Sequence, residues 1–267
     1  MHTKTQNLTL STFATRTLTR GLALGSLLFC LAAPSQAATL DVCSSGCSYS
    51  TVASAVSAAS AGDVIELGPG TYNEGGIYIG KSLTLRSSGS RATIDAGSSS
   101  YVFFVGAGKV VSFEDLILQG GTQCRLDNRG ITYLSTVSVR GLGAVSQYGG
   151  IHNAPGGVLT IQDSSDLSTN VSPFYGGGIS NFGDLTFLNS TAIGNTGADG
   201  GAIFNGGGTV SVLSSSLSSN HAIKRGGAWA NVSGTFAFHG SSSYSGNTAM
   251  VACDKFWNPG ATPDCVN

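Results

Sequence analysis

Charged side chains are scarce in this sequence. Lysine, arginine, aspartate and glutamate together make up 10% of its 267 residues, with 13 basic and 14 acidic side chains. A protein that binds nucleic acid through phosphate contacts needs a basic patch or stripe, and this sequence contains none. Nucleic acid is therefore excluded as an expected partner.

Long apolar runs are also missing, except at the N-terminus. Residues 1–37 combine three basic side chains with the apolar run "GLALGSLLFCLAA" and the small-residue sequence "SQA". The run is too short to cross a bilayer, and the order of these features predicts a secretory signal peptide cut after Ala37. A retained membrane anchor is the alternative. We expect a secreted protein, extracellular or at the cell surface, with no membrane span in its mature form.

Cysteine is sparse, with six in the chain and five of them beyond the leader. Four of these form two close pairs near the chain ends, Cys43 with Cys47 and Cys253 with Cys265. Exported proteins form disulfides, so we expect one bridge at each end and a buried free thiol at Cys124. Zinc is the alternative, but no histidine lies near either pair. We expect no metal and no cofactor.

Helical periodicity is missing between residues 100 and 250, which excludes ankyrin, tetratricopeptide and HEAT repeats. A motif of two glycines, an apolar residue and an asparagine occurs instead as "GGIHN", "GGISN", "GGAIFN" and "GGAWAN". Alternating segments such as "LTIQDSS" and "LTFLNST" follow it, and a second asparagine comes after each segment. At intervals of about 25 residues, the two series are Asn128, Asn153, Asn181, Asn205 and Asn231, then Asn170, Asn195, Asn220 and Asn247.

Period-2 alternation between glycine-rich turns predicts β-strands. One such strand and two asparagines per repeat predict an all-β parallel solenoid of roughly eight coils. Coils stacked every ~4.8 Å would align four inward side chains, Ile151, Ile179, Ile203 and Trp229. The asparagines would form ladders at corners, where asparagine tolerates positive φ and its amide bonds the neighbouring coils. We interpret the motif as architecture, with a repeated binding site as the alternative.

Both ends of a solenoid need caps that hide its apolar core. "STVASAVSAASAGD" places four apolar residues on one face of a helix that ends at Gly62, namely Val52, Ala55, Val56 and Ala59. We expect three regions in the mature chain: an N-terminal cap with a disulfide and a helix over 38–62, a β-helix over 63–250 and a disulfide-stapled C-terminal cap over 251–267.

Two groups of segments carry a family resemblance. "AVSAASAGDVIELGPGTYNE", "KSLTLRSSG" and "ATIDA" resemble the first coils of right-handed parallel β-helix proteins of the pectin-lyase-like superfamily. "GNTGADGGAIFN" and "SSNHAIKRGGAWAN" are similar to the polymorphic membrane protein repeat, although Leu217 stands where that repeat has phenylalanine before Asn220. The resemblance implies a right-handed β-helix over nearly all of the mature chain. It implies no single activity, because the superfamily includes lyases, hydrolases, adhesins and binding proteins.

The richest cluster of charges is "CRLDNRG". If Leu126 points inward, Arg125 and Asp127 point outward and Arg129 lies just past the corner, while Arg140 falls near the end of the same coil. Glu114 or Asp115 would come from the coil beneath. Polysaccharide hydrolases need two carboxylates, and lyases of this fold pair a basic residue with carboxylates, often through calcium. The alternative is a set of solvated turn charges with an ion pair.

Two functions remain. The first is a non-catalytic, adhesin-like β-helix that presents a polar face of serine, threonine and asparagine to a polysaccharide, the cell envelope or another protein. The second is a polysaccharide lyase or glycoside hydrolase that uses the "CRLDNRG" cluster, with calcium in the lyase case. A groove with two carboxylates beside a basic residue would favour the enzyme. The sequence predicts no oligomeric state.

Overall fold

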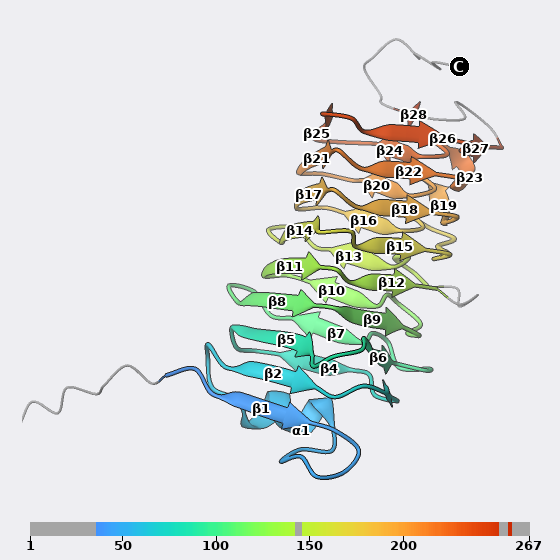
Figure 1. Ribbon diagram of the computed structural model, residues 1–267. Coiled ribbons are helices and arrows are strands. Elements are labelled where there is room, and N and C mark those ends of the chain that lie inside the picture. Colours follow the sequence, from blue (N-terminus) through green and yellow to red (C-terminus); the bar gives the residue numbers. More distant parts are fainter. Residues whose placement is uncertain (1–35, 142–145, 251–255, 258–267) are drawn as a thin grey trace, which may run out of the picture. The chain divides into compact units, whose positions relative to one another are not determined.

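A computed structural model describes residues 36–141, 146–250 and 256–257, and the compact unit begins at Ala37. Figure 1 shows that this unit is a stack of parallel strands, with the one described helix at its N-terminal end. No helix among these residues is long and apolar enough to cross a membrane.

The strands form three long sheets, here named A, B and C, and a short sheet D. Sheet A contains β1 (Thr39–Val42), β2 (Val64–Leu67), β5 (Leu83–Ser87), β8 (Val110–Glu114), β11 (Ile131–Ser135), β14 (Val158–Gln162), β17 (Asp184–Leu188), β21 (Thr209–Leu213) and β25 (Thr235–His239). Sheet B contains β3 (Thr71–Tyr72), β6 (Ala92–Asp95), β9 (Leu116–Gln119), β12 (Ser138–Arg140), β15 (Asp166–Ser168), β18 (Thr191–Ile193), β22 (Ser216–Ser218) and β26 (Ser243–Ser245). Sheet C contains β4 (Ile77–Ile79), β7 (Phe103–Val105), β10 (Leu126–Asn128), β13 (Ile151–Asn153), β16 (Ile179–Asn181), β20 (Ile203–Asn205), β24 (Trp229–Asn231) and β28 (Phe256–Trp257). Sheet D contains β19 (Thr196–Asp199), β23 (His221–Arg225) and β27 (Thr248–Ala249).

Each coil of the chain contributes one strand to sheet A, then one to sheet B, then one to sheet C. Every strand pairs in parallel with its equivalents in the coils before and after it, as β13 does with β10 and β16. Sheets B and C have eight strands each, so the described residues form eight coils. The predicted all-β parallel solenoid of about eight coils is confirmed.

The core lies inside the stack and is made of one inward column per strand position. On sheet C the register aligns Leu126, Ile151, Ile179 and Ile203, all with no exposed surface, and Trp229 follows at 9% exposure. Sheet strands buried on their inner face stabilise the fold through such apolar contacts. The predicted stack of Ile151, Ile179, Ile203 and Trp229 is therefore present.

The first asparagine series forms a ladder at the corner between sheets C and A. Each side-chain Nδ2 donates to the Oδ1 of the next asparagine, as from Asn153 to Asn181 at 2.7 Å and from Asn181 to Asn205 at 2.8 Å. The same Nδ2 atoms also donate to backbone carbonyls of the next coil, for example that of Asp184. These amides are buried, so they satisfy backbone acceptors that water cannot reach at the corner.

The second series forms a ladder at the end of sheet B. Asn195 Nδ2 donates to Asn220 Oδ1 at 3.0 Å, and its own Oδ1 accepts from Asn170 Nδ2 at 2.9 Å. The ladder begins at Asn170, whose Oδ1 is buried and has no hydrogen-bond partner among the described residues. A side chain at Gly150 would lie 3.0 Å from the Cγ of Asn170, which is one reason the repeat keeps glycine there.

The expected positive φ of the ladder asparagines is wrong, because none of the nine adopts it. The left-handed residues immediately precede the second ladder: Thr169, Gly194, Ser219 and Gly246, with φ between 54° and 64°. The preceding residue therefore makes the sharp turn. The asparagine is then free to point its amide inward along the ladder.

The N-terminal end is covered by α1 (Val52–Ala58), which buries Val52, Ala55 and Val56. Thr51 caps the helix by accepting the backbone N–H of Ser54 at 3.2 Å. A disulfide joins Cys43 to Cys47, and Cys124 is a buried free thiol. The pairing predicted for Cys253 and Cys265 lies outside the described residues.

Candidate functional site

The outward column at the centre of sheet C does not repeat. Successive strands place six side chains of five kinds in register there, before Ala230: Tyr78, Phe104, Asp127, His152, Ser180 and Phe204. The residues on either side of this column do repeat from β10 to β24, as large apolar core residues and corner asparagines. The fold does not require one residue type at a position that varies from coil to coil. This column is therefore the place to look for functional side chains.

Asp127 lies at the middle of the column and binds two cationic or ionisable groups. Its Oδ1 is 3.2 Å from His152 Nδ1, and its Oδ2 is 3.5 Å from an Arg129 guanidinium nitrogen. Arg129 also lies over the ring of Phe104, 4.7 Å from its centroid, with half of its side chain exposed. Asp127 is itself only 8% exposed. The carboxylate therefore positions an exposed guanidinium and an imidazole side by side.

The His152 ring is held by aromatic neighbours as well as by Asp127. It stacks on Tyr148 with centroids 4.1 Å apart, and Phe182 meets it edge-on at 5.7 Å. The hydrogen bond to Asp127 uses Nδ1, and Nε2 makes no hydrogen bond within the described residues. A carboxylate partner on Nδ1 fixes the tautomer, which leaves Nε2 available as a proton acceptor.

The hydroxyl of Tyr148 belongs to the same cluster. Burial raises the pKa of Tyr148, and the nearby Tyr175, Asp127 and Cys124 raise it further while Arg129 opposes them. Tyr148 is therefore a proton donor at neutral pH. Its ring lies parallel to that of Tyr175, with centroids 5.5 Å apart.

Aromatic rings continue from this cluster in both directions along sheet C. Toward the N-terminal coils, Phe104 contacts Tyr78 at 5.6 Å and Tyr101 at 5.6 Å. Toward the C-terminal coils, Tyr175 contacts Phe204 at 5.2 Å. Tyr78 is 59% exposed and forms the open end of the row. We call the whole set the aromatic row. It spans six coils, and the coil of Asp127 between its two parts contributes no ring. Its members are Tyr78, Tyr101, Phe104, Tyr148, His152, Tyr175, Phe182 and Phe204.

Arg125 does not point outward as predicted, because it is fully buried. It lies in the turn before β10, so strand alternation from Leu126 does not apply to it. Its guanidinium donates to the carbonyl oxygens of Gly141 and Gly149 and to Ser146 Oγ. Burial lowers the pKa of Arg125 to about 10, which leaves it charged at neutral pH. Arg125 is therefore a buried structural residue. Its guanidinium satisfies backbone and hydroxyl acceptors in the coil that precedes the second asparagine ladder.

The other predicted charges lie on different sheets from Asp127. Arg140 is on β12 of sheet B, where its Nε donates to Gln119 Oε1 at 3.0 Å. Glu114 is on β8 of sheet A. Asp115 follows it at the corner and pairs with Arg91 at 2.8 Å. The structure therefore brings Asp127 and Arg129 together and separates them from Arg140, Glu114 and Asp115.

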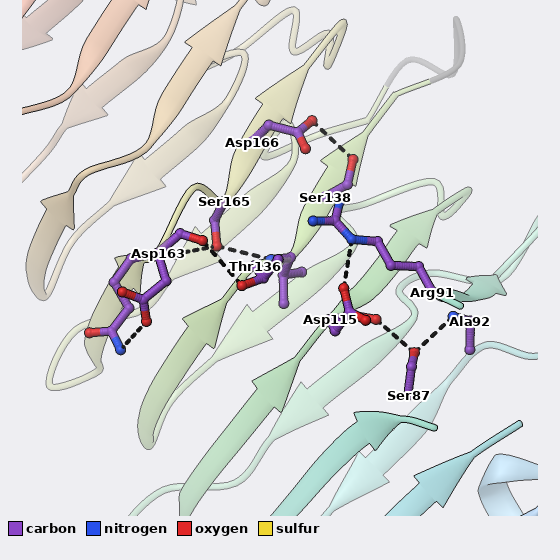
Figure 2. Close-up of polar contacts among 11 residues, drawn as sticks. Ser87, Arg91, Ala92, Asp115, Thr136, Ser138, Asp163, Ser165 and Asp166 are labelled. Atoms are coloured by element: carbon purple, nitrogen blue, oxygen red, sulfur yellow. Dashed lines mark hydrogen bonds and ion pairs between the residues drawn. The ribbon is translucent and has the colours of Figure 1, made fainter. Parts of the chain in front are cut away.

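The corner between sheets A and B differs between its two halves. Figure 2 shows that in the earlier coils its polar side chains bond to one another, as Arg91 does with Asp115 and Ser138 with Asp166. In the later coils the corner is hollowed by a groove of about 350 Å³ lined only by uncharged hydroxyl and amide side chains: Ser164, Asn189, Ser190, Thr191, Ser214, Ser215, Ser216, Ser241 and Ser243. Its lining has the residue types expected of a polar face, and no acid–base group is among them.

The column Asp127, His152 and Ser180 has the residue types of a nucleophilic triad, but its geometry is different. Ser180 is fully buried and its hydroxyl donates to the backbone oxygen of Tyr148 at 3.0 Å. A serine nucleophile must instead hydrogen-bond to the histidine and face the substrate. No group of three His, Cys, Asp or Glu within the described part of the chain is arranged to hold a metal ion.

Sequence reasoning missed the aromatic row and the role of His152. Three of its rings stand directly before or after a ladder asparagine: His152 before Asn153, Phe182 after Asn181 and Phe204 before Asn205. Comparing the residue before each asparagine from repeat to repeat would have found the column, since that position changes from acidic to aromatic to small while the asparagine stays the same.

No protein-family model matches this sequence, and neither does the sequence of any curated protein. Several solved structures are similar in fold. Pectin methylesterase PemA from Erwinia chrysanthemi is 14% identical, with 82% of this chain and 92% of that chain covered and a TM-score of 0.46. A mutant pectin methylesterase in complex with a hexasaccharide is 15% identical, with 83% and 93% covered and a TM-score of 0.44. The pectin methylesterase from Aspergillus niger in deglycosylated form is 18% identical, with 80% and 87% covered and a TM-score of 0.42.

Proposed function

We propose that this protein is a secreted, cell-surface-directed β-solenoid that binds a polysaccharide chain along the outer face of sheet C. The observation that supports this proposal best is the aromatic row, which follows the long axis of the solenoid over six coils. Aromatic rings offer a flat apolar face with little conformational entropy to lose, and tyrosine adds a hydroxyl at its edge. A polymer laid along the row would meet rings on five of these coils and Arg129 at the coil between its two parts.

Several weak contacts in a line suit a repeating ligand. Each ring and each polar group needs to contribute little, because contacts that are linked along one chain act together. Arg129 adds an exposed donor at the centre of the row, where its guanidinium can bind hydroxyl or anionic groups. The polar groove at the corner of sheets A and B has no aromatic residue, so we place the principal site on sheet C.

Glycoside hydrolysis is the less favoured form of the enzyme alternative. It needs two carboxylates flanking the scissile bond, roughly 5–10 Å apart. Asp127 is the only acidic residue on the described strands of sheet C. It also binds both His152 and Arg129, so it is positioned as a partner to them.

Affinity electrophoresis of residues 38–267 in gels that contain neutral or uronate polysaccharides tests the proposal. Tyr78→Ala should weaken binding about tenfold, because the open end of the row loses its ring. Tyr133→Ala is the matched control, since Tyr133 is an exposed tyrosine on sheet A. Equal effects of the two substitutions, or no retardation by any polysaccharide, would count against a site on sheet C.

A second candidate is a polysaccharide lyase, favoured by the juxtaposition of His152, Arg129 and Tyr148. In that reaction Arg129 would neutralise a sugar carboxylate while His152 Nε2 takes the proton from the adjacent carbon. The electron pair forms a carbon–carbon double bond as the glycosidic oxygen leaves, and Tyr148 gives that oxygen its proton. The ultraviolet absorbance of unsaturated sugar ends would show it. His152→Phe should abolish that signal and Arg140→Ala should keep it.

A further inference from the structure

We propose that removal of the leader completes the N-terminal cap, because the amino group released at Ala38 forms an ion pair with Asp63. The contact already exists between the backbone nitrogen of Ala38 and Asp63 Oδ1, which are 2.8 Å apart. Cleavage after Ala37 would convert that nitrogen from a neutral amide into a cation. The inference uses the predicted cleavage site and does not depend on the glycan-binding proposal.

Among the described residues, Asp63 is a buried carboxylate without a salt bridge. It is 7% exposed, its Oδ2 accepts the backbone N–H of Ser60 at 2.7 Å, and no described cation lies within salt-bridge distance of it. The nearest charged influence is Lys81, whose Nζ donates to the carbonyl oxygen of Ser57. The helix α1 beside it has no charged residue. A cation placed directly at Oδ1 would give this buried carboxylate the charged partner that it lacks.

The cleavage supplies that cation. Water adds across the peptide bond between Ala37 and Ala38, so that Ala37 keeps a carboxylate and Ala38 receives an amino group. An α-amino group has a pKa of about 7.7–8.0 and is protonated at neutral pH. Hydrogen bonds between ionised partners are roughly twice as strong as neutral ones. The 2.8 Å contact between an amide and a carboxylate therefore becomes an ion pair, in which both partners are charged, without any movement of the chain.

The position of the contact explains what it would stabilise. Ala38 immediately precedes β1, the edge strand of sheet A, and Asp63 immediately precedes its partner β2. The carbonyl oxygen of Ala38 also accepts the N–H of Val64 at 2.8 Å. An edge strand with one neighbour is prone to fray at its free end. The ion pair would pin that end only in the processed protein, so the precursor would keep a weaker cap.

The test compares two forms of the protein that both start at Ala38, one with a free amino group and one acetylated on it. Acetylation keeps an N–H donor and removes the charge. The free form should melt about 2–4 °C higher at neutral pH. The ion pair raises the pKa of the amino group, so the difference should be full from the pH at which Asp63 is ionised up to about pH 8, and it should vanish as the pH rises through the raised value.

Asp63→Asn should remove the difference between the free and acetylated forms. In case this variant folds poorly, the amino pKa is measured by NMR in the unaltered protein, where it should exceed that of the unfolded chain. Equal melting temperatures, an unshifted amino pKa or a difference that persists in Asp63→Asn would each overturn the inference. So would mass spectrometry of the exported protein that showed a first residue other than Ala38.

Discussion

Asn205 and Phe204 are neighbours on β20, and they belong to different parts of the molecule. Asn205 is identical in kind to its equivalents in the coils on both sides, and its amide is bonded along the ladder. Phe204 is aligned with Ser180 on one side and Ala230 on the other, and it contacts Tyr175. The repeated asparagine position thus stabilises the fold, and the variable position beside it forms part of the candidate site.

The same comparison separates two buried polar systems. The ladder amides bond one another in a row, so each depends on its neighbours. The Asp127 cluster is made of unlike groups that occur once in the stack, and Arg129 still reaches solvent. Substitutions in the ladders should lower stability, and substitutions in the Asp127 cluster should have smaller effects on stability.

The largest effect is expected for Asn205→Asp. Asn205 Nδ2 donates to Asn231 Oδ1 and to the carbonyl oxygens of Ser233 and Thr235, so a carboxylate there would face three acceptors. The free energy of unfolding should fall by about 3–5 kcal/mol, as for an uncompensated buried charge. Asn205→Ala should cost about 1–3 kcal/mol. Urea denaturation measures both, and an unchanged midpoint in both variants would mean that the ladder does not support the fold.

A smaller effect should distinguish the end of a ladder from its interior. Asn195 both donates to and accepts from ladder neighbours, whereas the Oδ1 of Asn170 has no hydrogen-bond partner in the described part of the chain. Asn195→Ala should therefore reduce the free energy of unfolding by about 1 kcal/mol more than Asn170→Ala, the value of a hydrogen bond. Equal losses from matched denaturation curves would show that position in the ladder is unimportant.

His152→Phe should lower stability less than the ladder substitutions, because Asp127 keeps Arg129 as a partner, and it separates the two functional candidates. Phenylalanine preserves the stack on Tyr148 and loses the bond to Asp127. If binding depends on the rings, the affinity for polysaccharide should change by no more than about twofold. Loss of a ring contact should instead lower the affinity about tenfold. Loss of binding in this variant, measured by isothermal titration, would show that the imidazole itself contacts the ligand.

The smallest effect concerns Cys124. Burial raises the pKa of its thiol, with Asp127 adding to the shift and Arg125 opposing it. A thiol held in its protonated form is a poor nucleophile. Iodoacetamide should leave the folded protein unlabelled at mildly alkaline pH and label one thiol after unfolding without reduction. Three labelled thiols would mean that Cys253 and Cys265 are not bridged.

Spacing alone was enough to predict the fold. Asparagines about 25 residues apart can meet only if each interval is one coil, and the register aligns Asn153 with Asn181 as that requires. The predicted outward direction of the Arg125 side chain was wrong, because the alternation rule for strands was applied to a residue that precedes the strand. The aromatic row was missed because tyrosines 148 and 175 lie in loops before β13 and β16, where no periodicity applies. Their contacts depend on how those loops fold over sheet C.

The common register of the coils has a consequence for how such a chain can change in length. From β10 to β24 each strand of sheet C has a large apolar core residue and a ladder asparagine. Both are in register with the same two positions in the strands before and after it. A whole coil can therefore be duplicated or deleted with its neighbours still matched, because each coil contacts only the adjacent ones. Gain or loss of one residue within a strand would instead shift the inward and outward faces and break both ladders. Genes for this architecture are expected to differ by entire coils, and the aromatic row would lengthen or shorten with them.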